Sequence, residues 1–398
     1  MKEFKEESLI VKTGMSMPHM DLHPETFPLF QTTTFTFDSL DEAKQGYKDM
    51  AKGENYTYIR TINPNRNALG EIVSLLEHGE KTAICTAGMG AISATLFSQL
   101  HAGDHAVYSN CCYGESLEIF RDILSVNGVE STAVNMADMD EVKAAMKPNT
   151  KMIYTETIAN PNMVLADIES LAKLAHDNNA ILVVDNTFTT ACAIKPLDIG
   201  ADIVVNSMTK FMNGHSDAIQ GAVTSDKATC KKIESMACCL GTIGDPFQSW
   251  LVMRGIKTID LRVPRQMSNA AKLAKALEAN PHVLKVNHPA VESYPQRELA
   301  KKMFKDDESM TAMMSIVLPD DQELMQKFTE KLTFAHYVPS LGGLRTSYQQ
   351  PVTSSHSHMP DADRRAVGIT PGMMRISVGI EDPEDLISDF LEALKVYD

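Results

Sequence analysis

Five short apolar runs, separated by segments of helical character, constrain the fold of this chain more than any other feature. The runs lie at residues 81–86, 106–108, 152–155, 181–185 and 203–206. Continuous apolar runs with helices between them are typical of strands buried on both faces of a mostly parallel sheet. One such helix is expected at 67–78, where apolar residues recur with helical spacing. The sequence therefore predicts an α/β fold with a mostly parallel central sheet.

The 398-residue chain is long enough for more than this one sheet. The first 60 residues contain Pro18, Pro24 and Pro28 and few periodic apolar faces, which predicts an irregular arm that wraps over a neighbour. Beyond residue 256 we expect a long helix at 256–279, strands at 282–286 and 313–318, and helices at 321–331 and 383–396. The predicted organisation is an N-terminal arm at 1–60, a cofactor-binding α/β domain at 61–256 and a smaller α+β domain at 257–398.

Composition narrows the classes of partner. Lys and Arg number 37 against 52 Asp and Glu, a net charge of −15 that disfavours binding to nucleic acid. No apolar run approaches the ~20 residues of a membrane helix, and the charged N-terminus does not resemble a signal peptide. Seven scattered cysteines favour reduced thiols, so we expect a cytoplasmic protein with no membrane partner.

Some residue pairs raise the question of a metal site. None of them has the spacing of a zinc site or a partner carboxylate at a matching distance along the chain. We therefore expect no metal. The pairs are Cys111 with Cys112, Cys238 with Cys239, and His356 with His358.

Residues able to hold an anionic cofactor follow three of the predicted strands. Ser207 and Thr209 offer hydroxyls to a phosphate, and Lys210 beside them becomes a nucleophile if it is held away from water. Asp185 ends another strand and can pair with a protonated ring nitrogen. Backbone amides at 88–90, where a helix begins, can bind phosphate. A phosphate cradle, an acid and a lysine at the carboxyl edge of a parallel sheet are the parts that hold pyridoxal 5′-phosphate (PLP).

Longer motifs extend this set along the chain. They are YTYIR at 56–60, AGMGA at 87–91, ETIANP at 156–161, VVDNT at 183–187, SMTK at 207–210, SLGG at 340–343 and RISVGIE at 375–381. From about residue 32 to residue 394 the chain resembles the trans-sulfuration, or Cys/Met-metabolism, family of PLP enzymes. This family includes cystathionine γ-lyase, cystathionine γ-synthase and methionine γ-lyase. The resemblance implies the aspartate-aminotransferase-like (type I) PLP fold.

The resemblance also implies a role for each motif residue at the cofactor. Lys210 bonds to PLP and moves protons between substrate carbons, Asp185 keeps the pyridine nitrogen protonated, and Tyr113 stacks on the ring as acid or base. The other implied cofactor ligands are Gly88, Met89, Ser207 and Thr209 at the phosphate, Asn160 near the ring, and Tyr58 and Arg60 from a neighbouring subunit. Shared sites imply a homo-oligomer, and the family's usual tetramer of paired dimers is expected here.

For the substrate, the resemblance implies that Arg375 grips the α-carboxylate of a small amino acid, with Ser340 nearby. The predicted reaction is γ-elimination to 2-oxobutyrate, ammonia and a thiol, with cystathionine as first choice and methionine or homocysteine next. The alternative is a γ-replacement synthase of the cystathionine γ-synthase or O-acetylhomoserine sulfhydrylase type, which shares every cofactor residue. A PLP-binding regulator without catalysis is a third hypothesis, disfavoured because the full catalytic set is present.

Three positions depart from the patterns of the nearest subgroups. Glu115 stands where methionine γ-lyases typically carry a cysteine. Pro339 and Arg345 stand where acids flank the SLGG turn of cystathionine enzymes. One hypothesis is that Glu115 contacts a distal ammonium and Arg345 a distal carboxylate, since cystathionine carries both groups. The alternative is that both side chains are solvated.

Overall fold

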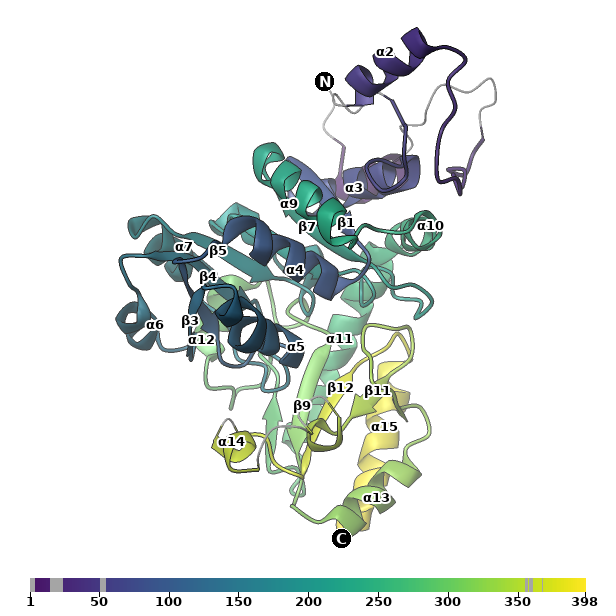
Figure 1. Ribbon diagram of the computed structural model, residues 1–398. Coiled ribbons are helices and arrows are strands. Elements are labelled where there is room, and N and C mark those ends of the chain that lie inside the picture. Colours follow the sequence, from purple (N-terminus) through teal and green to yellow (C-terminus); the bar gives the residue numbers. More distant parts are fainter. Residues whose placement is uncertain (1–3, 15–23, 51–54, 355–356, 358–360, 367) are drawn as a thin grey trace.

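The computed structural model describes residues 4–14, 24–50, 55–354, 357, 361–366 and 368–398. His356 and His358, for which no metal role is predicted, lie outside these residues. Two sheets and the helices around them make up the molecule, and the strands of the larger sheet lie between residues 81 and 225 (Figure 1).

The larger sheet has seven strands in the order β1-β7-β6-β5-β4-β2-β3. β7 runs antiparallel to both of its neighbours, and the other pairs are parallel, so the predicted mostly parallel sheet is confirmed. Its strands are β1 (Lys81–Cys85), β2 (His105–Ser109), β3 (Glu130–Val134), β4 (Thr150–Glu156), β5 (Ile181–Asp185), β6 (Ile203–Ser207) and β7 (Gly221–Ser225).

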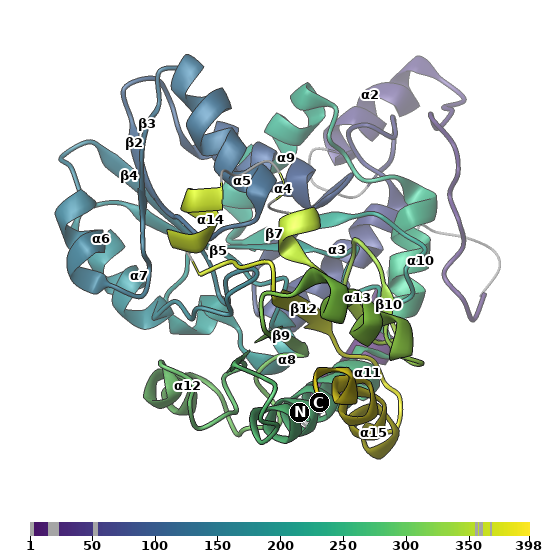
Figure 2. The ribbon, with the colours of Figure 1, turned by 90° about the horizontal axis from the view of Figure 1, so that it is seen from below.

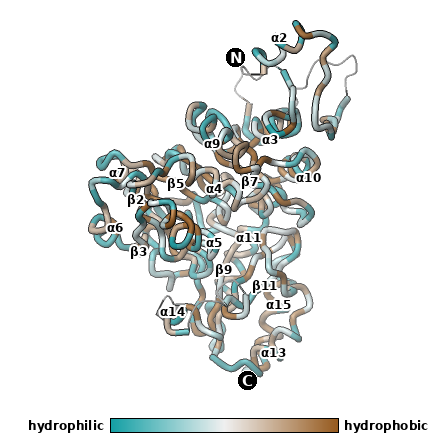
Figure 3. The backbone as a smooth tube through the Cα atoms, viewed as in Figure 1, coloured by the Kyte–Doolittle hydropathy of each residue, from teal (hydrophilic) through white to brown (hydrophobic). Residues whose placement is uncertain are grey.

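Each of the five apolar runs is a strand of this sheet, and alternate residues of a strand pack on opposite faces. Leu182 and Val184 of β5 lie in one apolar cluster, with residues of helices α3 (Pro64–Glu77) and α7 (Ile168–Asp177). Val183 lies in the other, with residues of α4 (Gly88–Gln99) and α9 (Lys227–Leu240). Figure 3 shows hydrophobic residues gathered around β7 and hydrophilic residues over outer helices such as α6 (Met139–Ala145).

The chain beyond residue 256 forms a second sheet of five strands in the order β10-β11-β12-β9-β8. The long helix α11 (Ile259–Glu278) packs against α15 (Pro383–Leu394), as Figure 2 shows from below. The strands are β8 (Lys285–Asn287), β9 (Met313–Val317), β10 (His336–Tyr337), β11 (Ser347–Gln349) and β12 (Met373–Ser377). The further helices are α12 (Arg297–Met303), α13 (Gln322–Lys331) and α14 (Asp361–Ala366).

One buried apolar cluster contains residues of both sheets, among them Leu182 and Ile316. This cluster crosses the domain boundary predicted at residue 256, so it does not mark where one domain ends. The predicted domain limits stay a prediction. The strand expected at 282–286 is shifted to β8, because Asn280 forms a turn there: its carbonyl accepts the Val283 N–H and its side chain accepts the His282 N–H.

The prediction that the first 60 residues are irregular was wrong in two places. α1 (Glu6–Lys12) and α2 (Leu40–Met50) are helices, and α2 stands away from the rest of the chain (Figure 1). The contacts that hold the described part of the segment between them include two from side chains farther along the chain: Trp250 Nε1 donates to the Phe27 carbonyl at 3.0 Å and Asn65 Nδ2 to the Pro28 carbonyl at 2.8 Å.

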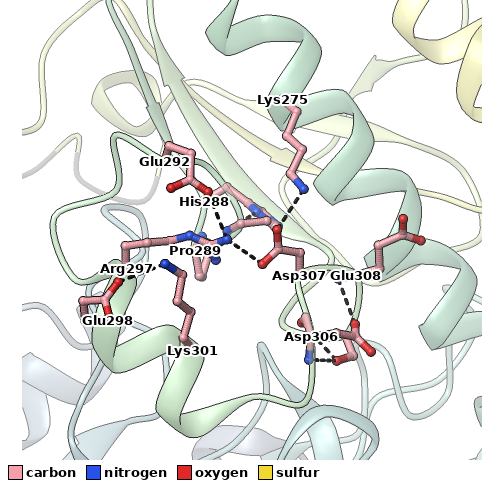
Figure 4. A network of polar contacts seen from close by, with 12 residues as sticks. Lys275, His288, Pro289, Glu292, Arg297, Glu298, Lys301, Asp306, Asp307 and Glu308 are labelled. Carbon is pink, nitrogen blue, oxygen red and sulfur yellow. Dashed lines mark hydrogen bonds and ion pairs between the residues drawn. The ribbon is translucent and has the colours of Figure 1, made fainter.

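A network of ion pairs joins α12 to α11 (Figure 4). Arg297 donates to Asp307 at 2.6 Å and to the Pro289 carbonyl at 2.9 Å, and Lys275 of α11 donates to the same Asp307 at 2.9 Å. Burial alone would raise the pKa of Asp307, but hydrogen bonds from these two cations hold it below the ordinary value.

None of the helices in the described ranges is long and apolar enough to span a membrane. All seven cysteines are free thiols.

Candidate active site

The carboxyl ends of β4, β5 and β6 lie side by side and carry Glu156, Asp185 and Ser207. Glu156 is directly opposite Asp185 in the parallel register of β4 and β5. Polar side chains therefore lie together at the carboxyl edge of the sheet, where the sequence motifs predicted a cofactor.

The first turn of α4 lies at this edge and has free backbone amides. Its N-cap, Ala87, provides no side-chain hydrogen bond, so the amides that open the helix have no capping partner. A Cβ on Gly88 would lie 2.8 Å from the Ser207 Cβ, so only glycine lets Ser207 come this close. The Thr209 hydroxyl accepts from the Gln220 N–H at 3.2 Å and donates to the Gln220 carbonyl at 3.3 Å, so it would have to turn its proton to reach a phosphate. Open helix amides and two hydroxyls fit a phosphate group, as predicted for Gly88, Met89, Ser207 and Thr209.

Asp185 accepts a hydrogen bond from the Thr187 amide at 2.9 Å. Burial raises the pKa of its carboxyl above the ordinary value. A cation placed beside such a carboxylate favours the charged form, and a protonated pyridine nitrogen is a cation of that kind. The site of Asp185 therefore fits the ring nitrogen of PLP.

Lys210 follows β6 and reaches toward the second sheet. Its Nζ donates to the Ser340 hydroxyl at 3.2 Å. Burial, and then the charge of Arg375, lowers the pKa of Lys210 to about 8. The SLGG turn packs against its backbone: a Cβ on Gly342, whose φ is +78°, would lie 2.8 Å from the Lys210 carbonyl carbon. The structure thus holds a reactive amine in place from both sides.

Arg375 is buried in β12 and donates to Asn160 Oδ1 at 3.1 Å and to the Ser340 carbonyl at 3.4 Å. Burial lowers the pKa of Arg375 to about 10. The guanidinium is charged at neutral pH and faces no carboxylate in these contacts. A planar cation of this kind fits a substrate carboxylate.

Tyr113 precedes the short helix α5 (Gly114–Glu118) and is 38% exposed. Burial and the nearby Glu115 carboxylate raise the pKa of the phenol to about 12, against the lowering effect of Arg375. The phenol therefore keeps its proton at neutral pH and can donate it.

Two of the three unusual positions, Glu115 and Arg345, differ in their surroundings. Glu115 is exposed, yet its charge acts on both Tyr113 and Lys210. Arg345 is also exposed, and within the described ranges it makes no ion pair. Of the two predicted substrate contacts, Glu115 lies beside the reacting groups.

Tyr58 and Arg60 are placed elsewhere. Tyr58 is 41% exposed and the Arg60 guanidinium lies 5.3 Å from its ring centroid. The Arg60 carbonyl accepts from the Cys238 thiol at 3.1 Å. Among the described contacts of this single chain, none joins these two residues to Lys210, and their role at a neighbour's cofactor stays a prediction.

Glu156 is a site residue that the sequence analysis did not single out. Its carboxylate accepts from the Tyr113 amide at 2.6 Å and from the Asn160 amide at 3.2 Å. The available signal was an acid at the carboxyl end of a strand, as for Asp185. Thr187 was also missed; its hydroxyl accepts from the Ser207 amide at 2.9 Å.

The sequence model of the family "Cys/Met metabolism PLP-dependent enzyme" matches residues 7–395. The chain belongs to this family. An L-methionine gamma-lyase of Fusobacterium nucleatum subsp. polymorphum is 40% identical, over 92% of this chain and 93% of that protein. A cystathionine beta-lyase of Lactococcus lactis subsp. cremoris (strain MG1363) is 36% identical, over 92% and 93%. The crystal structure of cystathionine gamma synthase from Xanthomonas oryzae pv. oryzae, in complex with aminoacrylate and cysteine, superposes with a TM-score of 0.92 at 31% identity over 99% of both chains.

Membership confirms several predictions. The type I PLP fold, the cofactor PLP and the assignment as a PLP-dependent carbon–sulfur lyase of the trans-sulfuration family are borne out. The substrate is a small amino acid.

Among the described residues, no group of three or more His, Cys, Asp or Glu is placed to hold a metal ion.

Proposed function

We propose that this enzyme catalyses γ-elimination on a sulfur amino acid, with cystathionine as first choice and methionine or homocysteine next. The observation that carries this proposal is the contiguous set of Lys210, Ser340 and Arg375, with the Tyr113 phenol beside it. The overall reaction consumes one water and releases a thiol, ammonia and 2-oxobutyrate.

The residues divide the work as follows. PLP, when bound between Asp185, Lys210 and the first turn of α4, supplies the electron sink for carbanion chemistry. Arg375 binds the substrate carboxylate and so orients the amino acid next to Lys210. Lys210, with a pKa of about 8, would take the proton from Cα, pass it on to the electron sink, and then, as a free amine again, take a proton from Cβ. Tyr113 keeps its proton at neutral pH and gives it to the departing sulfur.

Glu115 favours cystathionine within this reaction class. Its carboxylate acts on both Tyr113 and Lys210, so it lies near the point where the distal part of a substrate leaves. The distal half of cystathionine carries an ammonium that an acid attracts, whereas methionine ends in an uncharged methyl group. Arg345 is proposed to bind the distal carboxylate from its exposed position.

A γ-replacement synthase is the second candidate. The likeness to the solved cystathionine gamma synthase, with a TM-score of 0.92, supports it. Lyase and synthase would use the same Lys210, Asp185 and Tyr113, and differ in whether a second nucleophile completes the reaction.

The test is 2-oxo acid release by the cofactor-loaded protein. L-cystathionine, L-methionine, L-homocysteine and O-acetyl-L-homoserine are offered separately, with Lys210→Ala as the blank. We expect fast release from L-cystathionine. Consumption of O-acetyl-L-homoserine only when a thiol is added, with slow release from the sulfur substrates, would establish the synthase instead.

The role of Glu115 is tested by Glu115→Gln, with Glu118→Gln, an exposed acid of the same helix, as its control. We expect Glu115→Gln to lower kcat/KM for L-cystathionine relative to L-methionine by about tenfold, and Glu118→Gln to leave the ratio unchanged. If the ratio of the two kcat/KM values is unchanged in Glu115→Gln, Glu115 is a solvated surface residue that does not contact the substrate. Arg345→Ala is expected to move the ratio in the same direction by a smaller factor, because Arg345, unlike Glu115, is not among the charges that act on Tyr113 and Lys210.

We propose that the protein acts in the cytoplasm as a tetramer of paired dimers, in which Tyr58 and Arg60 complete a partner's phosphate site. The exposure of Tyr58 and the outlying position of α2 support this (Figure 1). Mixing equal amounts of Lys210→Ala and Arg60→Ala at limiting cofactor is expected to restore about a quarter of the wild-type activity. Random exchange makes about half of the dimers mixed, and half of the sites in a mixed dimer are intact. No recovery after subunit exchange would show that each chain completes its own site.

A further inference from the structure

Glu156 is a buried carboxylate whose two oxygens bind two different segments of the site. It ends β4 and is 8% exposed. Oε1 accepts the Tyr113 N–H at 2.6 Å, and Oε2 accepts the Asn160 N–H at 3.2 Å. The two amides are 47 residues apart in sequence, and one side chain joins them.

Each of these two segments carries a group of the proposed reaction. Tyr113 provides the phenol that faces Glu115 and Arg375. The Asn160 side chain accepts the Arg375 guanidinium at 3.1 Å. A shift of either backbone segment would therefore move the acid or the carboxylate-binding arginine relative to Lys210.

We propose that Glu156 is a positioning residue that fixes the Tyr113 segment and the Asn160 segment relative to each other. It acts through both carboxylate oxygens and touches neither substrate nor the reacting atoms. This inference rests on the proposed function only in the roles that it assigns to Tyr113 and Arg375.

The chemistry of this position favours a carboxylate over its closest substitutes. Two N–H donors need two acceptor oxygens, and Glu supplies both on one side chain. Gln supplies one oxygen and one NH2 group, so one backbone donor would face another donor. Asp is shorter by one methylene and cannot reach both amides from the same backbone position.

The surroundings of Glu156 show that this arrangement is retained against an electrostatic penalty. Burial, and then the charge of Asp185, raises the pKa of Glu156 to about 8, while the two amide hydrogen bonds lower it. Two carboxyls side by side in the interior repel each other when both are ionised. Since Asp185 serves the ring nitrogen, a second acid here needs a reason of its own, and the bridge between the two segments provides it.

The test is hydrogen–deuterium exchange at the Tyr113 and Asn160 amides of the cofactor-loaded protein, in wild type and in Glu156→Gln. We expect exchange at one or both amides to be roughly tenfold faster in Glu156→Gln, because one of the two acceptor oxygens is replaced by an NH2 donor. The matched control is Glu77→Gln. Glu77 is also a buried carboxyl; it accepts from Asn206 Nδ2 at 2.7 Å, and its replacement is expected to leave both amides unchanged.

Kinetics supply the second readout. Glu156→Gln is expected to lower kcat about 100-fold for every substrate that is turned over, since a displacement of about 1 Å has an effect of this size. Glu156→Asp keeps one carboxylate contact and is expected to recover part of kcat and the protection of one amide. If Glu156→Gln does not fold, amide exchange in Glu156→Asp tests the inference instead. Faster exchange at only one of the two amides is expected if Glu156 joins both segments, because the shorter side chain reaches only one of them.

Unchanged exchange at both amides in a folded variant would overturn the inference. The exchange measurement needs no substrate, so it is independent of which sulfur amino acid is cleaved. Failure of the proposed function would appear as absence of 2-oxo acid release in wild type with both amides still protected.

Discussion

Two clusters of charged side chains in this molecule differ in whether neighbouring charges have the same or opposite sign. Around Lys210 buried like charges are neighbours: Arg375 acts on Lys210, and Asp185 acts on Glu156, while the opposite charge that acts on Lys210, Glu115, is exposed. Around Arg297 opposite charges alternate, with Asp307 between Lys275 and Arg297 at 2.9 and 2.6 Å (Figure 4). The first cluster lies where the two sheets meet, and the second joins two helices of the C-terminal part.

The two arrangements move pKa values in opposite directions. Burial shifts Lys210, Arg375, Glu156 and Asp185 toward their neutral forms. In the other cluster, hydrogen bonds hold Asp307 and Arg297 in their charged forms, against the effect of burial. Groups with shifted pKa values are ready to exchange protons or to accept charge from a ligand, whereas matched pairs stabilise the fold. We therefore expect the cluster around Lys210 to serve the reaction and the cluster around Arg297 to stabilise the fold.

The largest expected effect is that of Lys210→Ala. The mutant loses the only amine that this account places at the reacting carbons, and we expect turnover to fall by more than about 10⁴-fold. The melting temperature should stay close to that of wild type, because the charge of Lys210 is not matched by a carboxylate contact. Lys231→Ala, an exposed lysine of α9, is the control and should be fully active. Appreciable turnover in Lys210→Ala would break the functional half of the comparison.

Arg375→Lys keeps the charge and removes the planar fork. We expect kcat/KM to fall about 100-fold, mostly through KM, because two charge-assisted hydrogen bonds to the substrate carboxylate cannot both be made. Steady-state kinetics with L-cystathionine check this. Arg265→Lys, on the surface of α11, is the control. A normal KM in Arg375→Lys would place the carboxylate at another residue.

Asp307→Asn probes the stabilising cluster. Urea unfolding at fixed protein concentration should show a loss of about 2 kcal/mol, since Arg297 and Lys275 lose a shared charged acceptor, while kcat stays unchanged. The pKa of folded Asp307 is below its ordinary value, so its contribution is present above about pH 4 and is lost as the pH falls through the folded pKa. Wild type and mutant should therefore converge in stability at low pH. A loss of activity at unchanged stability would reverse the assignment of this cluster.

The smallest effect concerns the coupling of the two site cations. In the cofactor-free protein, the rate of amine modification at Lys210 should rise with a midpoint near pH 8, because its pKa is lowered to about 8. Arg375→Met removes a positive neighbour, which favours the ammonium form and moves the midpoint upward. Arg265→Met should leave the midpoint in place. An unmoved midpoint in Arg375→Met would mean that burial alone sets the pKa of Lys210.

Much of the fold could be predicted because both faces of the larger sheet are covered. Buried strands such as β5 and β6 are continuous apolar runs that are visible in a single sequence. β3 was not predicted, since only Val134 of its five residues is buried and the strand lacks such a run. β7 was missed because it is built from small residues, although all five are buried. α3 begins before the predicted helix, where Asn63 caps it by accepting from the Asn65 and Arg66 amides.

The candidate site was predictable to the extent that its residues follow strands. Ser207 and Asp185 end strands of the sheet, and parallel pairing brings such ends together. Glu156 ends a strand in the same way, but its role depends on the backbone amides of Tyr113 and Asn160, which no side-chain pattern reveals. The contact of Lys210 with Ser340 joins residues that are 130 apart in sequence. The resemblance to known enzymes predicted that they share a site, but it did not predict their hydrogen bond.

The central claim is that this site breaks the Cγ–S bond of a sulfur amino acid. Mass spectrometry of the 2-oxo acid formed from L-cystathionine by the cofactor-loaded protein tests it most directly, with Lys210→Ala as the blank. The account predicts 2-oxobutyrate together with cysteine. Pyruvate together with homocysteine would place the cleavage at the other carbon–sulfur bond and contradict the proposed γ-elimination.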